Sequence, residues 1–534
     1  MLFHRLSVSA LLVAASFQLS EAAATRSAKD PLSACASTNP QSDKVKEAFV
    51  FAYNAYKKYA WGHDELLPLS KSYSDSRNGW GASIVDGLDT MLIMGLETEY
   101  QEALGFIEKI DFSFSNTTSK GFETNIRYLG GLLAANDLRP NKMLVKKAVE
   151  VAEFTLMPLF VQTTSLGSNL MVPLTYMNFK TNRPEAGKTI NLAEFGTYTM
   201  EFTRLSQVTG DPKYERLANN LVNAAIRHPT RMPGLFPTSW TVDPFAPVDA
   251  STITIAGGGD SFYEYLIKNY ILQTDKNEDH KLTWQNSVES IEEYMLSPTS
   301  QNPDIKYVAM IGNHSVYYTS QELICYWPGN ILLGITQITD EAKRTKYRKF
   351  ADTFYDSCIE AWVKTETSIA PETWNWVPQD DSLEKKLNGL FENSLKSSNI
   401  PKKSHQKRSG ASSTKTINRS FYVGNSIYDL RPETFESIFY YYRLLGDTKY
   451  QNIAEVLFDS INELIRTDAG FTRLRNVDKR PVMLENFQES FFFAETLKYL
   501  YLTFTDKNCI SLNDYVFNTE AHPFTLPESI AYQS

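Results

Sequence analysis

The chain has 534 residues, of which 42% are hydrophobic and 22% are charged, and its formal net charge is −9. This is the composition of a globular protein with a large core, and the negative charge argues against a nucleic-acid-binding surface. Length alone allows two to four domains, but the repeats described below favour one large repetitive domain. Aromatic residues make up 13% of the chain, which suits either sugar stacking or helix packing.

Residues 1–24 have the features of a secretory signal peptide. Arg5 gives a basic start, Ala10–Phe17 a short apolar region, and Ala22–Ala24 a small-residue cleavage site. The alternative is a signal anchor, but the apolar run is too short to span a bilayer. We expect residues 25–42 to be an N-terminal extension of a mature chain that has no membrane span. That chain would be secreted or lumenal, with the Golgi and the vacuole both open.

Three sequons fit this route, at Asn116, Asn313 and Asn418. Sequons also arise by chance, so each one is a candidate glycosylation site rather than an established one. The chain ends in Ala-Tyr-Gln-Ser, which is not a retention tetrapeptide.

The four cysteines also suit an oxidising compartment, because an even number favours disulfides. Cys325 and Cys358 lie on consecutive helices of one predicted hairpin, so we pair them. Elimination then leaves Cys35 and Cys509, whose pairing would tie the two ends of the chain together. No cysteine–histidine spacing suggests a zinc site.

Acidic residues begin apolar helical segments along most of the chain. Successive members are 62 to 71 residues apart, except for one step of 111 that contains an insert. The acids are Glu123, Glu194, Asp260, Glu322, Glu433 and Glu495. Second helices lie between these segments, and residues 208–226 are a near copy of residues 444–465. The pattern predicts an all-α fold, a closed ring of helical hairpins that aims these carboxylates at one cavity. Acids gathered in this way imply a metal, a polyhydroxyl ligand or acid/base chemistry.

The helix predicted at residues 431–443 shows the pattern most clearly. Pro432 is tolerated in a first helical turn, and Glu433 lies at the positive end of the helix dipole. Glu436 falls on the same face, three residues later. The alternative is that Glu433 only caps the helix. Residues 43–60 form a further amphipathic helix.

Three other segments stand out. Within residues 79–96, Asp86 and Asp89 lie in an apolar run, either as site acids or as a helix cap and a buried structural acid. Residues 381–417 are rich in Ser and Lys and predict a mobile surface insert, in which Lys407-Arg408 is either a processing site or part of a solvated loop. Residues 515–524 lack a helical pattern. Their Thr519 can offer a hydroxyl and a carbonyl to one hard cation, or can be merely structural.

Six stretches, in this order, resemble the class I α-mannosidases of glycoside hydrolase family 47. They are GWGASIVDGLDTMLIMGL, FETNIRYLGGLL, GDSFYEYLIK, RPETFESIFYYYR, AETLKYLYL and VFNTEAHPF. The resemblance covers roughly residues 45–524. It implies an (α/α)7 barrel of seven helical hairpins at 43–525, followed by a tail at 526–534. It also implies a monomeric, Ca²⁺-dependent, inverting enzyme that removes α-1,2-linked mannose from oligomannose N-glycans.

The resemblance assigns roles to the acids. Glu123 matches the acid that protonates the glycosidic oxygen through a water, and Glu433 matches the general base. Asp260 is a third acid that is the alternative proton donor, and Glu372 matches a further carboxylate sometimes assigned as catalytic. Thr519 matches the Ca²⁺ ligand. The remaining matches are pocket residues that hold sugar hydroxyls or Ca²⁺-bound waters, namely Arg127, Glu194, Glu264, Glu436, Phe491, Glu495 and Glu520.

The sequence departs from the family pattern at two positions. Gly258 stands where members of the endoplasmic reticulum carry an arginine, which resembles Golgi-type and secreted fungal members and predicts trimming of several branches. Glu322 stands where many members have a histidine thought to lie in the active site, so we expect a lower pH optimum or an altered affinity. The alternative function is a mannosidase-like lectin with little turnover. A third is an unrelated α/α barrel that acts on another polysaccharide.

Overall fold

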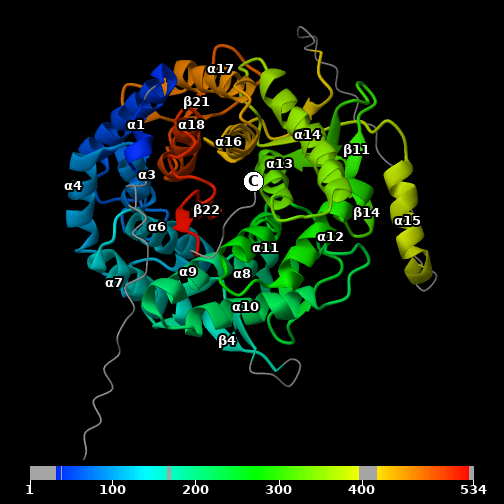
Figure 1. Ribbon diagram of the computed structural model, residues 1–534, viewed down its shortest axis with the longest axis horizontal. Helices are drawn as coiled ribbons and strands as arrows, with labels where there is room; N and C mark the ends of the chain where they lie inside the picture. The colour runs from blue at the N-terminus through cyan, green and yellow to red at the C-terminus, as the bar shows by residue number, and fades with distance from the viewer. Residues whose placement is uncertain (1–31, 38, 165–169, 396–417, 528–534) are drawn as a thin grey trace, which may run out of the picture.

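The computed structural model describes residues 32–37, 39–164, 170–395 and 418–527, which form a ring of helices (Figure 1). The predicted signal peptide, the Lys407-Arg408 pair and most of the C-terminal tail lie outside these ranges. Within them, no helix combines the length and the apolar character needed to cross a membrane.

In the described chain, seven helix pairs surround a central axis, each with an inner and an outer member (Figure 1). The inner helices are α3 (Leu88–Ile93), α6 (Gly130–Leu138), α9 (Thr199–Thr209), α11 (Asp260–Leu272), α13 (Trp327–Ile335), α16 (Glu433–Leu445) and α18 (Leu497–Thr503). Their outer partners are, in the same order, α4 (Glu97–Ile107), α7 (Lys142–Val151), α10 (Lys213–Ile226), α12 (Glu278–Tyr294), α14 (Glu341–Val363), α17 (Lys449–Leu464) and α1 (Pro40–Tyr59). This confirms the predicted barrel of seven hairpins.

The two sets of helices differ in how they bury their residues. Every residue of α11 after Asp260 is buried, as expected for a helix enclosed by neighbours on all sides. The outer α10 is amphipathic and buries one stripe at helical spacing, made of Tyr214, Ala218, Leu221, Val222 and Ala225. Inner helices are therefore set rigidly by the core, and their N-terminal ends can hold side chains in fixed positions.

The ring closes between the two ends of the chain, because α1 packs against α18. The Cys35–Cys509 disulfide joins these ends, and the Tyr501 hydroxyl donates to the Cys35 carbonyl oxygen at 2.7 Å. Cys325 and Cys358 form the second disulfide. The predicted Cys325–Cys358 pairing is confirmed, and the two cysteines that elimination left are also joined.

Short segments lead into several inner helices and carry site residues. They are α2 (Ala82–Asp86), α5 (Gly121–Glu123), η2 (Thr124–Leu129), α8 (Leu192–Gly196), η6 (Glu322–Tyr326) and η7 (Phe492–Thr496). Small antiparallel sheets connect the pairs, among them β8 (Thr189–Asn191), β9 (Ser239–Thr241) and β10 (Ala246–Pro247), and β15 (Thr319–Gln321), β16 (Thr373–Asn375) and β17 (Tyr422–Val423).

A β-hairpin occupies the centre of the ring (Figure 1). Its strands are β22 (Tyr515–Phe517) and β23 (Pro523–Thr525), paired antiparallel. In the turn between them, the Asn518 side-chain oxygen accepts from the Glu520 and His522 backbone N–H groups at 2.9 and 2.7 Å. This turn presents Thr519 to the interior, consistent with the non-helical pattern predicted for residues 515–524.

Two predicted boundaries are wrong. Helix α1 begins at Pro40 rather than at residue 43, because Asn39 caps it by accepting from the Gln41 N–H at 2.9 Å. The insert predicted at 381–417 begins with helix α15 (Ser382–Leu395), because Leu383 and Leu387 lie one turn apart and are both buried. Residues 396–417 lie outside the described part.

Candidate functional site

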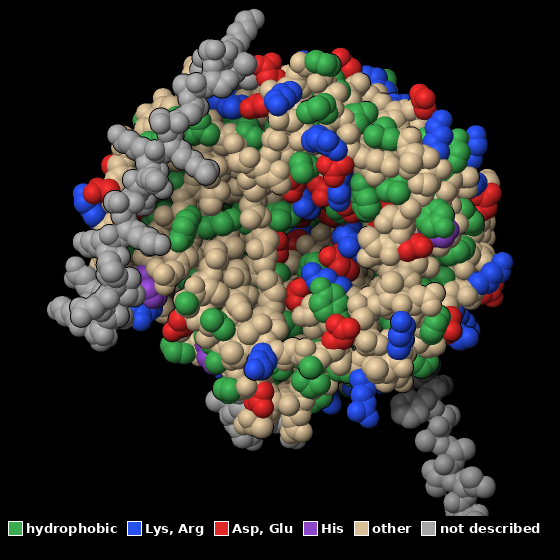
Figure 2. Space-filling view, turned by 180° about the vertical axis from the view of Figure 1, so that it is seen from behind, with side chains coloured by type: hydrophobic (Ala, Val, Ile, Leu, Met, Phe, Trp, Pro, Cys, Tyr) green, Lys and Arg blue, Asp and Glu red, His purple; other side chains and the backbone are tan. Residues whose placement is uncertain are grey.

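The N-terminal ends of the inner helices surround a cavity of about 280 Å³ at the barrel axis. Figure 2 shows acidic and basic side chains gathered in a hollow at the centre of this face. Most of the predicted site residues line the cavity, namely Glu123, Arg127, Glu194, Asp260, Glu433, Phe491, Glu495, Thr519 and Glu520. A smaller recess of about 50 Å³ adds Glu264 and Glu436. The cavity is near the lower end of the size range of small-ligand sites.

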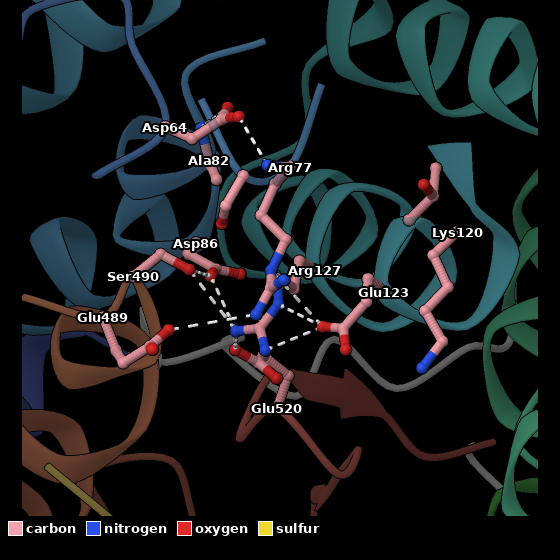
Figure 3. Close-up of polar contacts among 12 residues, drawn as sticks. Asp64, Arg77, Ala82, Asp86, Lys120, Glu123, Arg127, Glu489, Ser490 and Glu520 are labelled. Atoms are coloured by element: carbon pink, nitrogen blue, oxygen red, sulfur yellow. Dashed lines mark hydrogen bonds and ion pairs between the residues drawn. The ribbon is translucent and has the colours of Figure 1, made fainter. Parts of the chain in front are cut away.

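One side of the cavity is lined by Lys120, Glu123 and Arg127, and Arg77 contacts Glu123 from outside the lining (Figure 3). We call these four residues the cation-paired wall. Arg127 binds the Glu123 carboxylate at 2.9 Å, and Arg77 approaches it at 3.6 Å. Burial alone would raise the pKa of Glu123. The positive charges of Arg127, Arg77 and Lys120 outweigh it and lower that pKa to about 2. Glu123 is therefore ionised at neutral pH and holds no proton of its own to donate.

Arg127 is itself held by two further acids, of which Glu520 lines the cavity and Asp86 lies behind its surface (Figure 3). It pairs with Asp86 at 3.3 Å and with Glu520. Asp86 also faces the His522 ring, with Oδ1 and Nε2 3.5 Å apart. Asp86 is fully buried and does not line the cavity, which favours the structural alternative for this acid.

Asp89 has a similar supporting position. It pairs with Lys498 at 2.6 Å and lies 3.2 Å from the His522 ring nitrogen. The Lys498 ammonium also donates to the Ala521 carbonyl oxygen at 2.8 Å. These contacts anchor the central hairpin to α3 and α18, so Asp89 is a structural acid as well.

A second part of the lining, which we call the acid-rich wall, consists of Asp260, Glu433 and Glu495. Burial raises the pKa of Asp260 to about 6, although the Ser261 N–H donates to its carboxylate at 2.8 Å. Burial also raises the pKa of Glu433 well above its usual range, which nearby Arg431 opposes. Burial raises the pKa of Glu495 as well, and the charge of Glu520 acts in the same direction. This wall therefore carries acids with too few cations to compensate them.

The recess beneath the cavity contains a buried ion triad. Lys268 pairs with Glu264 on its own helix and with Glu436 of α16 at 2.8 Å. Burial raises the pKa of Glu436 to about 7 in spite of this lysine. Thr519 lies beside the triad and lines both spaces, and its backbone N–H donates to the Tyr265 hydroxyl at 3.1 Å.

The fit of this recess to a divalent cation follows from its donors. The polar groups that line the recess are carboxylate and hydroxyl oxygens, which are the hard donors that Ca²⁺ prefers. Their negative charge exceeds the positive charge of the nearby Lys268. Across the described residues, no three His, Cys, Asp or Glu side chains are close enough to bind a metal directly. A cation here would therefore be held by the Thr519 oxygens and by waters, with Glu264, Glu436, Glu495 and Glu520 as the acids that hold those waters.

Glu372 lies outside the cavity lining, unlike the other acids predicted to be catalytic. Its carboxylate binds Arg431 at 3.1 Å and accepts from the Asp429 N–H at 3.2 Å. The guanidinium groups of Arg431 and Arg127 lie 5.7 and 5.6 Å from the centre of the Phe491 ring, which borders the cavity as predicted. Glu372 thus orients a cavity arginine and does not itself face the cavity.

Glu322 also lies behind the cavity surface. It is only 1% exposed, and its neighbour Leu323 lines the cavity instead. The prediction that this carboxylate is aimed at the cavity is wrong, because the first turn of η6 directs its side chain toward Thr434 of α16.

Sequence reasoning identified Arg127 but missed the other cations of the site, which are Arg77, Lys120, Lys268 and Arg431. Arg431 and Lys268 could have been found, because Arg431 lies two residues before Glu433 and Lys268 lies one turn after Glu264. Arg77 and Lys120 come from connecting segments and have no comparable signal. The three sequon asparagines Asn116, Asn313 and Asn418 are exposed.

A ring of helical hairpins that gathers several carboxylates, arginines and an aromatic ring in one cavity defines a glycoside hydrolase. Comparison of the sequence with models of known protein families agrees with this assignment, because the family model "Glycosyl hydrolase family 47" matches residues 48–526. The chain belongs to this family.

Individual relatives match over nearly the whole chain. The mannosyl-oligosaccharide alpha-1,2-mannosidase 1B of Aspergillus oryzae is 35% identical, over 91% of this chain and 92% of the relative. The mannosyl-oligosaccharide alpha-1,2-mannosidase of Penicillium citrinum is 34% identical, over 92% and 93%. The solved alpha-1,2-mannosidase from Trichoderma reesei superposes with a TM-score of 0.80 at 30% identity, over 92% of this chain and all of the solved one.

Proposed function

We propose that this glycoside hydrolase is an exo-acting α-1,2-mannosidase that removes terminal mannose from oligomannose N-glycans in the secretory pathway. The observation that carries the proposal is the cavity of carboxylates at the inner-helix N-termini, in a chain that matches named α-1,2-mannosidases over nine-tenths of its length. The two disulfides suit an oxidising compartment. We expect the enzyme to act as a monomer.

The cavity supplies the two functions that an inverting glycosidase needs. Asp260, with a pKa of about 6, can hold a proton in mildly acidic solution and is our choice for the general acid. Glu433 is our choice for the general base that activates water. Glu123 is ionised by its cations, so its part in proton delivery is to orient the water that carries the proton.

The reaction is proposed to need Ca²⁺, held by the hydroxyl and carbonyl oxygens of Thr519. Bound Ca²⁺ would ligate vicinal sugar hydroxyls and favour the ionised forms of nearby carboxylates. Phe491 would lie under the terminal mannose. Glu194, at the rim of the cavity, and Arg127, inside the cavity, would bind the hydroxyls of that mannose. The assignment of the Ca²⁺ site is supported by the hard oxygen donors that line the recess.

Trimming of several branches is supported by Gly258 at the cavity rim. Its φ is +97°, and a Cβ there would lie 2.8 Å from the Asn191 amide nitrogen. A larger side chain would therefore strain the backbone and narrow the rim, whereas glycine leaves room for different branches. A single mannose removed from one branch, followed by stalling, would contradict this part of the proposal.

The test is release of mannose from a labelled nine-mannose glycan, with and without a calcium chelator, beside a Glu433→Gln variant. We expect Ca²⁺-dependent trimming to a five-mannose product that the variant does not form. NMR of the first product would show the anomer opposite to that of the substrate. Tight binding of the glycan without release by the unaltered chain would overturn the proposal in favour of a lectin.

A further inference from the structure

Glu322 is a buried carboxyl that the proposed reaction does not use. Its Oε1 accepts from the Thr434 hydroxyl at 2.6 Å and from the Trp362 indole N–H at 3.1 Å. The same indole N–H lies 3.0 Å from the Thr434 hydroxyl oxygen, so the three side chains form a closed triangle. Oε1 already accepts twice, so a proton on this carboxyl would reside on Oε2. Among the described residues, Oε2 has no hydrogen-bond partner.

This triangle adjoins the predicted base. Thr434 follows Glu433 directly at the start of α16, and Glu433 Oε2 is likewise buried without a partner in the described chain. On the other flank, the Glu322 backbone N–H donates to the Glu372 carbonyl oxygen at 3.1 Å, and the Glu372 carboxylate holds Arg431. Glu322 therefore contacts both segments that fix the position of Glu433.

The surroundings of Glu322 are short of positive charge. The titratable and charged groups that face it are Tyr428, Glu372, Arg431 and Glu433, while α14 contributes the neutral Trp362. Burial raises the pKa of Glu322 to about 7, with Glu372 acting in the same direction and Arg431 against it. Two neighbouring buried carboxyls do not ionise independently, because each charge raises the pKa of the other.

We propose that Glu322 and Glu433 share one negative charge across Thr434, so that Glu322 positions Glu433 and sets the pH range in which Glu433 can act as a base. The inference rests on the proposed function. While Glu322 carries the charge, Glu433 keeps its proton and cannot accept one from water. A neutral residue at 322 removes this competition, so Glu433 ionises at lower pH.

The first test follows kcat/KM against pH for hydrolysis of α-1,2-linked mannobiose by the full chain with saturating Ca²⁺. We expect Glu322→Gln to move the acidic limb down by about one pH unit, the scale at which neighbouring carboxyls couple. Glu65→Gln is the matched control. Burial also raises the pKa of Glu65 to about 7, but its charged neighbours are Asp64, Arg77 and Glu489. The control should leave the limb in place.

The second test needs no activity. An acid whose folded pKa is above its ordinary value costs stability as the pH rises from 4.5 to 7. The Tm of Glu322→Gln, relative to that of the unaltered chain, should therefore increase as the pH rises across this window. In a Glu433→Gln background, where no charge is shared, the gain should be smaller. Equal gains in the two backgrounds overturn the sharing of charge.

The positioning role has its own readout. Thr434→Val removes the hydroxyl that binds the Glu322 carboxylate to the residue next to Glu433. We therefore expect kcat to fall about tenfold while KM changes little, and Thr434→Ser should restore kcat. Equal rates for the valine and serine variants would overturn positioning. If the unaltered chain releases no mannose at any pH, the proposed function fails. If it is active and Glu322→Gln leaves the acidic limb unmoved, this inference alone fails.

Discussion

The two walls of the cavity use the same residue type in opposite electrical settings. On the cation-paired wall, Arg127 and its neighbours lower the pKa of Glu123 to about 2. On the acid-rich wall, burial raises the pKa of Asp260 to about 6 and also raises the pKa of Glu433 well above its usual range. The difference teaches that the environment, not the residue type, divides the roles. One wall keeps a permanent charge, and the other can hold and release protons near neutral pH.

The sharpest way to break this comparison is to neutralise one acid on each wall. Glu433→Gln and Asp260→Asn should each reduce kcat on the labelled glycan by about 10²–10⁴-fold, the range for general acid–base catalysis. The two variants should differ on α-mannosyl fluoride, whose leaving group needs no proton. Asp260→Asn should recover much of its rate on the fluoride, because only the proton donor is missing.

The rate of Glu433→Gln should not recover on α-mannosyl fluoride, because the attacking water still lacks its base. Glu123→Gln is the comparison from the other wall, and we expect the fluoride to rescue it less than Asp260→Asn. Rescue of Glu123→Gln but not of Asp260→Asn would reverse our assignment of the proton donor.

Removal of Arg127 should have the largest effect on stability. Arg127→Gln leaves Asp86, Glu123 and Glu520 without their shared partner, and breaking a buried ion pair costs about 3–5 kcal/mol. The lowered pKa of Glu123 contributes stability that is full above pH 4.5 and lost as the pH falls toward 2. Urea unfolding should therefore show a large deficit at pH 6 that narrows below pH 4. A deficit independent of pH would mean that packing, not charge, is responsible.

Ca²⁺ removal tests the acid-rich wall. At a Ca²⁺ concentration 100 times its Kd, binding should stabilise the chain by about 2.7 kcal/mol. The raised pKa values of Asp260 and Glu436 mean that stability without Ca²⁺ is lost as the pH rises from about 4 to 7. The Tm gain on adding Ca²⁺ should thus be larger at pH 7 than at pH 5. Thr519→Val is the matched variant, and an undiminished gain in it would exclude the Thr519 hydroxyl as a ligand.

The sequence predicted the acids better than the cations for a physical reason. An acid at a helix N-terminus leaves a local signal in the apolar pattern that follows it, as for Asp260 and Glu433. A cation such as Arg77 reaches Glu123 only through the path of a connecting segment, which depends on tertiary packing. The burial of Glu322 and of the Glu372 carboxylate behind the cavity was equally out of reach, since both depend on how segments distant in sequence pack beside α16.

The same distinction applies to the fold. Repeats of local pattern predicted the hairpins and the Cys325–Cys358 disulfide, whereas Cys35 and Cys509 were paired only by elimination. Helix α15 was missed because the polar composition of residues 381–417 masks the two buried leucines near its start. The extended hairpin at the barrel centre had no periodicity of its own, and only its order after the last inner helix marked it as distinct.

The smallest effect expected is at the rim of the cation-paired wall. Lys120 pairs with Glu194 at 3.0 Å, but its side chain is 35% exposed. Water and salt screen such a pair, so Lys120→Met should change the free energy of unfolding by less than about 1 kcal/mol, and by still less in 1 M salt. Urea unfolding at low and high salt measures this. A loss as large as that of Arg127→Gln would mean that the rim and the buried arginine form a single network. The permanent charge of Glu123 would then depend on the whole wall, not on Arg127 and Arg77 at its core.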